Sequence, residues 1–395
     1  MELQLIYFII FPLIGIGLEL LISKIFKKIT GFTTIIFSAI MLVLALLFFS
    51  QFDATQKGVQ FIYEYPWVSE WGLSFKLALD GIGCLGTALF SIIFFVVLII
   101  SKKKERNTTH YVMMALLQIT VFLFLLSYDF VLKILFWEAS WIPIFFLLVN
   151  SSKKSFAILY SKYWFLSEVL IVIACLLLFK TTGMSYDVEK ITQVHAGETA
   201  TFIIMSLMII GTMIRTALFP FSLFMEKAIH TCEENISAVV AIIMTIIPLF
   251  FMVSIVIPLF LKELIIYTDL ISIIVLLSML VCIIKLFIDK RISTIIYAQI
   301  LMFNATTFIW LIRPTNDLLG ASFEIIITKS LINIVILYLG KAIISDERNN
   351  SQFNKWLFII SIIISFGIPG IINIGPVFKL ISSWYSINSY VSISI

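Results

Sequence analysis

The sequence predicts an all-α polytopic membrane protein with about 12 transmembrane helices. Of its 395 residues, 61% are hydrophobic and only 13% are charged, which leaves too little polar surface for a water-soluble protein of this length. Apolar runs of about 20 residues, enough to cross a hydrocarbon core of roughly 30 Å, recur from end to end. Two of these runs are interrupted by proline or glycine, as in transporters built from inverted repeats.

Windows of about 19 residues predict where the helices lie. The expected spans cover approximately residues 3–23, 31–50, 78–101, 110–128, 129–149, 157–180, 200–229, 236–260, 266–288, 291–312, 318–344 and 355–381. The first apolar run follows directly from Met1 and Glu2 without a basic segment. It is therefore expected to be the first span and not a cleavable signal peptide.

Two connections are long enough to have structure of their own. Residues 51–75 are polar and aromatic, and the run from Tyr63 to Trp67 predicts an interfacial hairpin or loop. Residues 181–200 form the other sizeable loop. Asp80 opens the third span, where it is expected to act as an interfacial cap or turn residue.

The basic residues of the connections predict the orientation of the chain. The connections after odd-numbered spans hold Lys24, Lys27, Lys28, Lys102, Lys103, Lys104, Arg106, Lys153, Lys154, Lys290, Arg291 and Arg348. The connections after even-numbered spans hold fewer, namely Lys57, Lys76, Lys180, Lys190, Lys262 and Arg313. By the positive-inside rule, the first set faces the cytoplasm or mitochondrial matrix and the N-terminus faces the opposite side.

No motif in the sequence predicts a redox centre, a nucleotide site or a nucleic-acid partner. The cysteines, Cys84, Cys175, Cys232 and Cys282, share no C-x-x-C spacing and are expected to behave as small hydrophobic residues. The histidines, His110, His195 and His230, are too scattered for a haem pair or a metal cage. Nucleotide chemistry would therefore have to reside on another chain.

Two charged residues inside apolar runs predict a path for ions or protons. Glu138 lies halfway along the fifth span, and Arg215 lies on the seventh, just before Pro220. Such residues normally face a partner or water, because an isolated charge in hydrocarbon costs several kcal/mol. Pro220 lacks the N–H that would bond the carbonyl of Thr216, so the seventh helix is expected to break there. The alternative is a static Glu138–Arg215 ion pair that only fixes helix register.

Lys329 lies near the centre of the eleventh span, too deep for easy snorkelling. Desolvation favours the neutral form of a buried lysine, so it can load and release a proton. A second helix break is expected at Gly367–Gly370 in the twelfth span. The predicted organisation is an N-terminal three-helix segment (1–109, with the loop 51–76), a first repeat (110–260) and a second, apparently truncated repeat (261–395).

Weaker candidates for proton translocation are Glu168, Lys285 and Glu324. Glu168, in the middle of the sixth span, could pair with Arg215 in place of Glu138. Lys285, like Lys162, lies close enough to a predicted helix end to snorkel to the interface.

Several segments resemble a known family. The run Leu77–Ile82 is similar to the opening of its third span, and Trp137–Pro143 to the stretch around its essential carboxylate. Arg215–Phe221 is similar to its seventh-span lysine segment, and Lys227, Ala228 and His230 to the run that follows. Ile292–Gln299 and Ser365–Asn373 give looser matches. On these residues the chain resembles subunit 4 of respiratory complex I, the proton-pumping NADH:ubiquinone oxidoreductase, one of its Mrp-antiporter-like subunits.

This resemblance implies an antiporter-like fold and proton translocation through Glu138, Arg215 and Lys329, with His230 and Lys379 as weaker candidates. It implies no cofactor on this chain, since FMN, iron–sulfur clusters and ubiquinone belong to other subunits. The implied partners are other membrane-arm subunits and phospholipid, including cardiolipin. The implied location is the mitochondrial inner membrane, with the N-terminus in the intermembrane space; the bacterial plasma membrane is the alternative.

The chain also departs from the family pattern. Arg215 replaces a lysine, and arginine is effectively never deprotonated in proteins. The eighth span reads Ile246-Ile247-Pro248 where the family has a lysine, and Val377 occupies the place of the twelfth-span carboxylate. The family continues for one or two more spans. Two alternatives follow: a degenerate, structural subunit that does not pump, or a subunit of an Mrp-type cation/proton antiporter.

Overall fold

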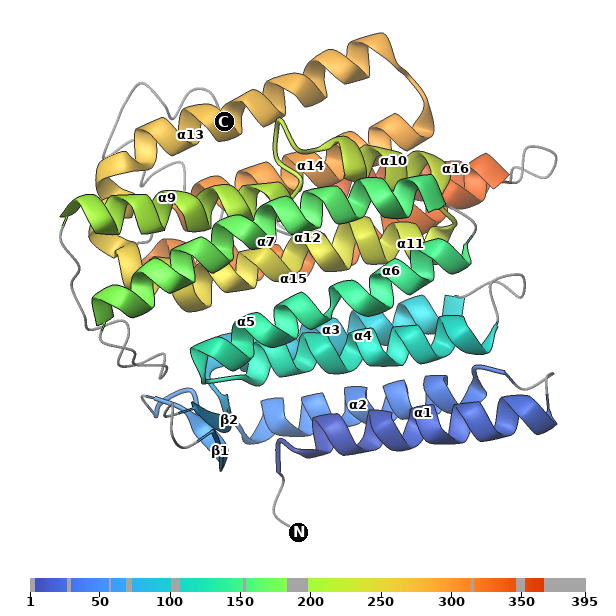
Figure 1. Ribbon diagram of the computed structural model, residues 1–395. Coiled ribbons are helices and arrows are strands. Elements are labelled where there is room, and N and C mark those ends of the chain that lie inside the picture. Colours follow the sequence, from blue (N-terminus) through green and yellow to red (C-terminus); the bar gives the residue numbers. More distant parts are fainter. Residues whose placement is uncertain are drawn as a thin grey trace. The chain divides into compact units, whose positions relative to one another are not determined.

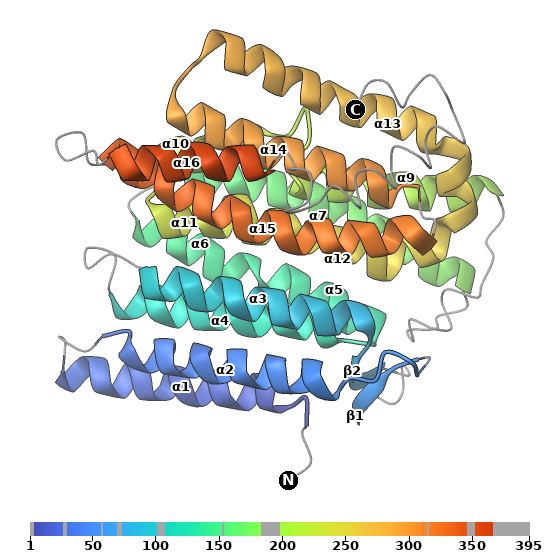
Figure 2. The ribbon, with the colours of Figure 1, turned by 180° about the vertical axis from the view of Figure 1, so that it is seen from behind.

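The computed structural model describes residues 4–26, 30–56, 58–68, 73–100, 107–151, 154–182, 198–313, 316–345 and 352–365. The described chain is mostly helical, which confirms the predicted all-α class (Figures 1 and 2). Contacts between residues group the chain into two compact units, Met1–Gly211 and Thr212–Ile395. The predicted break at Gly367–Gly370 and the candidate Lys379 lie outside the described residues.

The first unit consists of α1 (Tyr7–Ile25), α2 (Phe32–Gln51), β1 (Gln60–Val68), β2 (Leu73–Leu79), α3 (Gly81–Ile100), α4 (Thr108–Leu126), α5 (Phe130–Ala139), α6 (Trp141–Asn150), α7 (Lys154–Thr182) and the first part of α9 (Glu198–Arg215). The helices α1 to α4 pack around buried aromatic rings. The Phe8 ring lies 5.6 Å from Phe48 and 5.1 Å from Phe122, between ring centroids. These tilted and edge-on ring pairs tie α1 to α2 and α4.

The loop before the third span is an antiparallel hairpin, as predicted. Tyr63 pairs with Leu77, and Glu64 pairs with Lys76 across the two strands. Figure 1 shows the hairpin at the end of α2. Asp80 follows β2, and its Oδ1 accepts the N–H of Gly83 at 2.6 Å. This bond confirms the expected capping role of Asp80 at the start of α3.

A buried carboxylate that the sequence analysis overlooked joins α1 to α2. Glu19 is 1% exposed on α1. Its Oε1 accepts the N–H of Gly31 at 2.7 Å, and its Oε2 accepts the hydroxyl of Thr33. Glu19 therefore satisfies backbone and side-chain donors at the start of α2, so its role is helix capping.

The second unit contains the end of α9, then α10 (Leu223–Thr231), α11 (Glu234–Ala238), the π-helix η4 (Val239–Ile243), α12 (Met244–Phe251), the π-helix η5 (Met252–Val256), α13 (Ile257–Ile288), α14 (Ile292–Leu311), α15 (Asn316–Ser345) and α16 (Gln352–Ser365). Each π-helix precedes a proline, Pro248 or Pro258, which removes a helical N–H donor. The seventh span is broken between α9 and α10, as predicted.

Ten described helices are long and apolar enough to cross a membrane. One of them, Glu234–Ile288, is 55 residues long, about 80 Å, which is more than twice the hydrocarbon thickness. It has non-helical backbone angles at Phe260, and Figure 1 shows the chain turning back in this region. This run therefore holds the predicted spans 236–260 and 266–288, and α16 begins the predicted twelfth span.

Exposed apolar residues follow the outer faces of these helices, as a lipid environment requires. On α13 they include Ile266 (71% exposed), Phe287 (79%) and Ile288 (80%). The fold is therefore that of a polytopic membrane protein.

The close approach of Gly31, just before α2, to Tyr111 on α4 can be tested by mutation. Gly31 has φ +88°, and a Cβ there would come within 2.1 Å of the Tyr111 ring. We expect Gly31→Ala to lower the free energy of unfolding by about 1–3 kcal/mol, through strain and overpacking. Thermal unfolding of the purified protein in detergent measures this effect.

Gly17→Ala is the matched control, because no atom lies within 4 Å of a Cβ built at Gly17 in α1. It should leave stability unchanged or raise it slightly. Equal midpoints for the two variants would contradict this packing.

Candidate functional site

Glu138 lies one turn before Pro143. The expected span 129–149 corresponds to Phe130–Asn150, in which α5 and α6 meet at Ser140, a residue with helical backbone angles (φ −65°, ψ −19°). Pro143 explains the interruption, because its ring excludes the helical contact with the carbonyl of Ala139. Glu138 is half-buried on the last turn of α5. The carbonyl of Ala139, next to Glu138, therefore has no helical N–H donor.

The Glu138 carboxylate is oriented by an indole. Trp164 on α7 is 3% exposed, and its Nε1–H donates to Glu138 Oε2 at 2.8 Å. Glu168 lies one helical turn after Trp164, on the same face of α7, and is also half-buried.

Arg215 occupies the last turn of α9 and is 4% exposed. The helix ends in a Schellman arrangement: Ala217 N–H donates to Ile214 O (3.2 Å), and Leu218 N–H donates to Met213 O (3.0 Å). Ala217 has φ +59°, a left-handed conformation that normally favours glycine. The cation of Arg215 thus lies at the negative end of the helix dipole.

Three side chains from α13 and α14 bind the segment between α9 and α10. Asn304 Nδ2 donates to Thr216 O at 2.9 Å. It therefore replaces the helical N–H donor that Pro220 lacks. Phe219 N–H donates to Ser278 Oγ at 2.9 Å, and Tyr297 donates to Ser222 Oγ at 2.9 Å. Side chains of the second unit therefore satisfy the backbone and hydroxyl groups of the segment that interrupts the helix.

Glu138 belongs to the first unit and Arg215 to the second. The predicted Glu138–Arg215 pair, and the alternative pair with Glu168, stay predictions.

Lys329 lies on α15, with most of its side chain away from solvent. Within the described part of the chain, its ammonium group forms no hydrogen bond or ion pair. Its neighbour Ser330 bonds Ile326 O in its own helix. Glu324, one turn earlier on α15, is exposed, which places it away from the buried groups.

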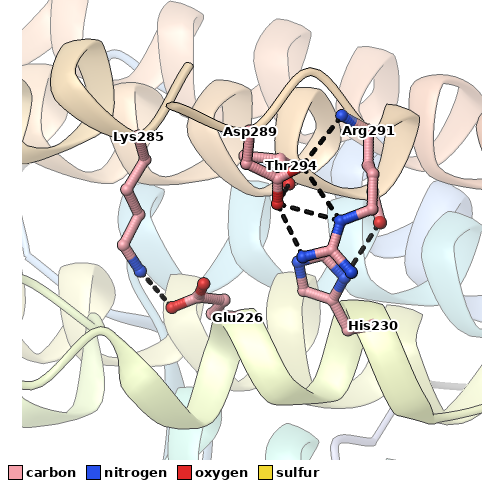
Figure 3. A network of polar contacts seen from close by, with 7 residues as sticks. Glu226, His230, Lys285, Asp289, Arg291 and Thr294 are labelled. Carbon is pink, nitrogen blue, oxygen red and sulfur yellow. Dashed lines mark hydrogen bonds and ion pairs between the residues drawn. The ribbon is translucent and has the colours of Figure 1, made fainter. Parts of the chain in front are cut away.

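A polar network joins α10 to the ends of α13 and α14 (Figure 3). Lys285 on α13 forms an ion pair with Glu226 on α10. Beyond the end of α13, Asp289 accepts bonds from Arg291 Nη2 (2.6 Å) and from Thr294 Oγ1 (2.7 Å). These hydrogen bonds, with that of Arg291 first, lower the pKa of Asp289. Lys285 therefore has an acidic partner, and not only the interfacial position expected for it.

His230 lies in the same network. Its Nδ1 is 2.9 Å from Ser293 Oγ, and its Nε2 is buried without a hydrogen-bond partner among the described residues. Burial lowers the pKa of His230, and the charge of Arg291 lowers it further, although Glu226 and Asp289 oppose this. The neutral imidazole is therefore favoured in the folded protein.

Three charged residues of interest were not predicted. Lys133 is 5% exposed on α5, and its Nζ donates to Phe124 O at 3.2 Å. Lys341 on α15 donates to the carbonyls of Ile229 and Cys232 at the end of α10. Glu226 binds a lysine 59 residues away. Lys133 has a sequence signal, a lysine inside an apolar run, whereas the partners of Glu226 and Lys341 depend on tertiary packing.

The pKa of His230 predicts how stability varies with pH. Because its pKa is lower in the folded chain, the unfolded chain binds more protons as pH falls through about 6.5, the usual histidine range. Stability should therefore decline on acidification below this range. Thermal unfolding from about pH 7.5 to about pH 5 should show a weaker decline in His230→Gln than in the unaltered chain.

The other histidines are present in both proteins, so the difference between the two pH curves reports on His230 alone. Parallel curves would contradict the assignment.

Comparisons with known proteins agree with this architecture. A family model described as "NADH:quinone oxidoreductase/Mrp antiporter, TM" matches residues 127–395. No curated protein matches the chain in sequence.

Three solved structures have a similar fold. Respiratory complex I from Thermus thermophilus with bound NADH contains a chain with TM-score 0.83 and 15% identity, over 99% of this chain and 84% of that one. The Mrp complex from Dietzia sp. DQ12-45-1b gives TM-score 0.84 and 15% identity, over 100% and 77%. The membrane-bound sulfane sulfur reductase, an archaeal respiratory membrane complex, gives 0.83 and 13%, over 96% and 81%.

These structures confirm the antiporter-like fold. Because the family model covers more than half of the sequence, the chain belongs to the NADH:quinone oxidoreductase/Mrp antiporter transmembrane family.

Proposed function

We propose that the chain is a membrane-arm subunit of a proton-pumping NADH:ubiquinone oxidoreductase, corresponding to its subunit 4, and that it contributes to proton translocation. The observation that carries this proposal is Glu138, an ionisable residue in an apolar span, one turn before Pro143, with its carboxylate held by Trp164. Family membership and the similarity to a complex I chain support the assignment.

In this proposal, electron transfer on other subunits drives proton movement through this one. Glu138 carries the negative charge, and Arg215 holds and modulates it without releasing its own proton. Lys329 exchanges protons, because desolvation favours the neutral form of a buried lysine that has no ionic partner among the described residues. Conformational changes that alter the distances between these charges would set the direction of transfer.

The chain would carry no cofactor; FMN, iron–sulfur clusters and ubiquinone would be bound elsewhere in the complex. Its partners would be neighbouring antiporter-like and accessory subunits and phospholipid, with cardiolipin on the side of the basic loops. We place it in the mitochondrial inner membrane with its N-terminus in the intermembrane space; a bacterial plasma membrane is the alternative.

A second candidate function is structural. The helix α12 is buried throughout and consists of Met244-Thr-Ile-Ile-Pro-Leu-Phe-Phe251, so the eighth span has no ionisable residue there to continue a relay. Such a subunit would hold its neighbours without pumping. An Mrp-type antiporter is a third candidate, since the Mrp chain matches the fold as well as the complex I chain does.

Glu138→Gln tests the pumping role. We expect the assembled enzyme to retain its subunits but to move fewer protons per electron, because the neutral amide cannot accept a proton. The measurement is the proton-to-electron ratio in native membrane vesicles oxidising NADH. Glu198→Gln, an exposed acid in the first turn of α9, is the control and should leave the ratio unchanged.

An unchanged ratio in assembled Glu138→Gln enzyme would favour the structural function. Ion transport by a complex without NADH oxidation would favour the Mrp-type function.

A further inference from the structure

Two buried amide oxygens of the second unit have no partner among the described residues. Asn304 on α14 is 0% exposed and Asn333 on α15 is 1% exposed, and the Oδ1 atom of each is without a hydrogen-bond donor. Leaving a buried acceptor unsatisfied costs about 1–3 kcal/mol. Such groups in native proteins usually bind ordered water.

The two asparagines lie at the same depth. The helices α14 and α15 are neighbours joined by a short connection, and Ile296 approaches Gly340 where they pack. Asn304 follows Ile296 by about 12 Å along its helix, and Asn333 precedes Gly340 by about 10.5 Å along the antiparallel one. The unpartnered oxygens therefore belong to one layer of the unit.

Next to this layer lie hydrogen-bond donors that have no partner among the described residues. Lys329 precedes Asn333 by four residues, so their side chains lie on the same face of α15. Its ammonium carries donors that no described residue accepts, whereas the asparagine oxygens offer only acceptors. A water molecule between them would satisfy both kinds of group, and 2–4 polar partners are what a buried water needs.

Asn304 also contacts the segment that interrupts the helix between α9 and α10. Asn304 donates its Nδ2–H to Thr216 O in the segment after α9, while its Oδ1 remains available. The Asn304 amide thus bonds the segment between α9 and α10 through its nitrogen, and its oxygen lies in the layer that holds Asn333.

We propose that Asn304 and Asn333 bind ordered water that connects Lys329 to the broken α9–α10 segment. They are positioning residues: neither titrates, and each acts by holding water through which a proton can reach Lys329. The proposed water site does not depend on pumping, whereas its use in proton transfer rests on the proposed function.

The water site is tested by cryo-electron microscopy of the assembled complex, at a resolution that shows ordered water. We expect water density within about 3 Å of Asn333 Oδ1 and of Lys329 Nζ. A dry layer, or protein or lipid groups bonded to both asparagine oxygens, would overturn the inference.

The role in transfer is tested by Asn333→Leu, which keeps similar volume but removes the acceptor. We expect proton translocation per assembled enzyme to fall about tenfold, less than the ~10²–10⁴ typical for loss of an acid or base itself. Asn333→Ser, which retains a group that binds water, should restore most of the rate. Thr328→Val is the control, because the Thr328 hydroxyl bonds Glu324 O in its own helix.

The outcomes separate the two proposals. If Lys329→Met slows proton translocation but Asn333→Leu does not, the positioning role is wrong and the proposed function stands. If Lys329→Met has no effect, pumping through Lys329 is wrong, and the water density alone decides whether the site exists.

Discussion

A break in a transmembrane helix frees backbone groups, and the hydrocarbon core offers no water to satisfy them. This constraint explains why polar side chains of α13 and α14 face the segment between α9 and α10. Asn304 donates its amide N–H to the carbonyl of Thr216, and Ser278 accepts the N–H of Phe219. Tyr297 holds Ser222 at the start of α10. The residues that permit the break are therefore on α13 and α14, far from it in sequence.

Unsatisfied backbone carbonyls also explain where the buried cations lie. The last turn of a helix has carbonyls without helical partners and a negative dipole end. Arg215 lies at the end of α9, and Lys341 donates to the carbonyls at the end of α10. Lys133 donates to a carbonyl in the last turn of α4. These cations of an apolar sequence thus lie where the ends of helices stabilise them.

The sequence predicted the features that depend on local chemistry. The hydropathy pattern predicted the spans, Pro220 predicted the α9–α10 break, and the aromatic run near Tyr63 predicted the hairpin. The end of α9, however, depends on Ala217 in a left-handed conformation, which alanine does not signal. Glu226 and Lys285 are 59 residues apart, so only tertiary packing pairs them.

Amide hydrogen exchange of residues 216–222 in the purified complex tests most directly whether α14 sustains the break. In the unaltered chain, Phe219 N–H should be protected by its bond to Ser278. In Asn304→Leu, exchange of this segment should accelerate while the middle of α14 remains protected. Unchanged protection in Asn304→Leu would show that the segment holds its shape without α14, and would contradict the account.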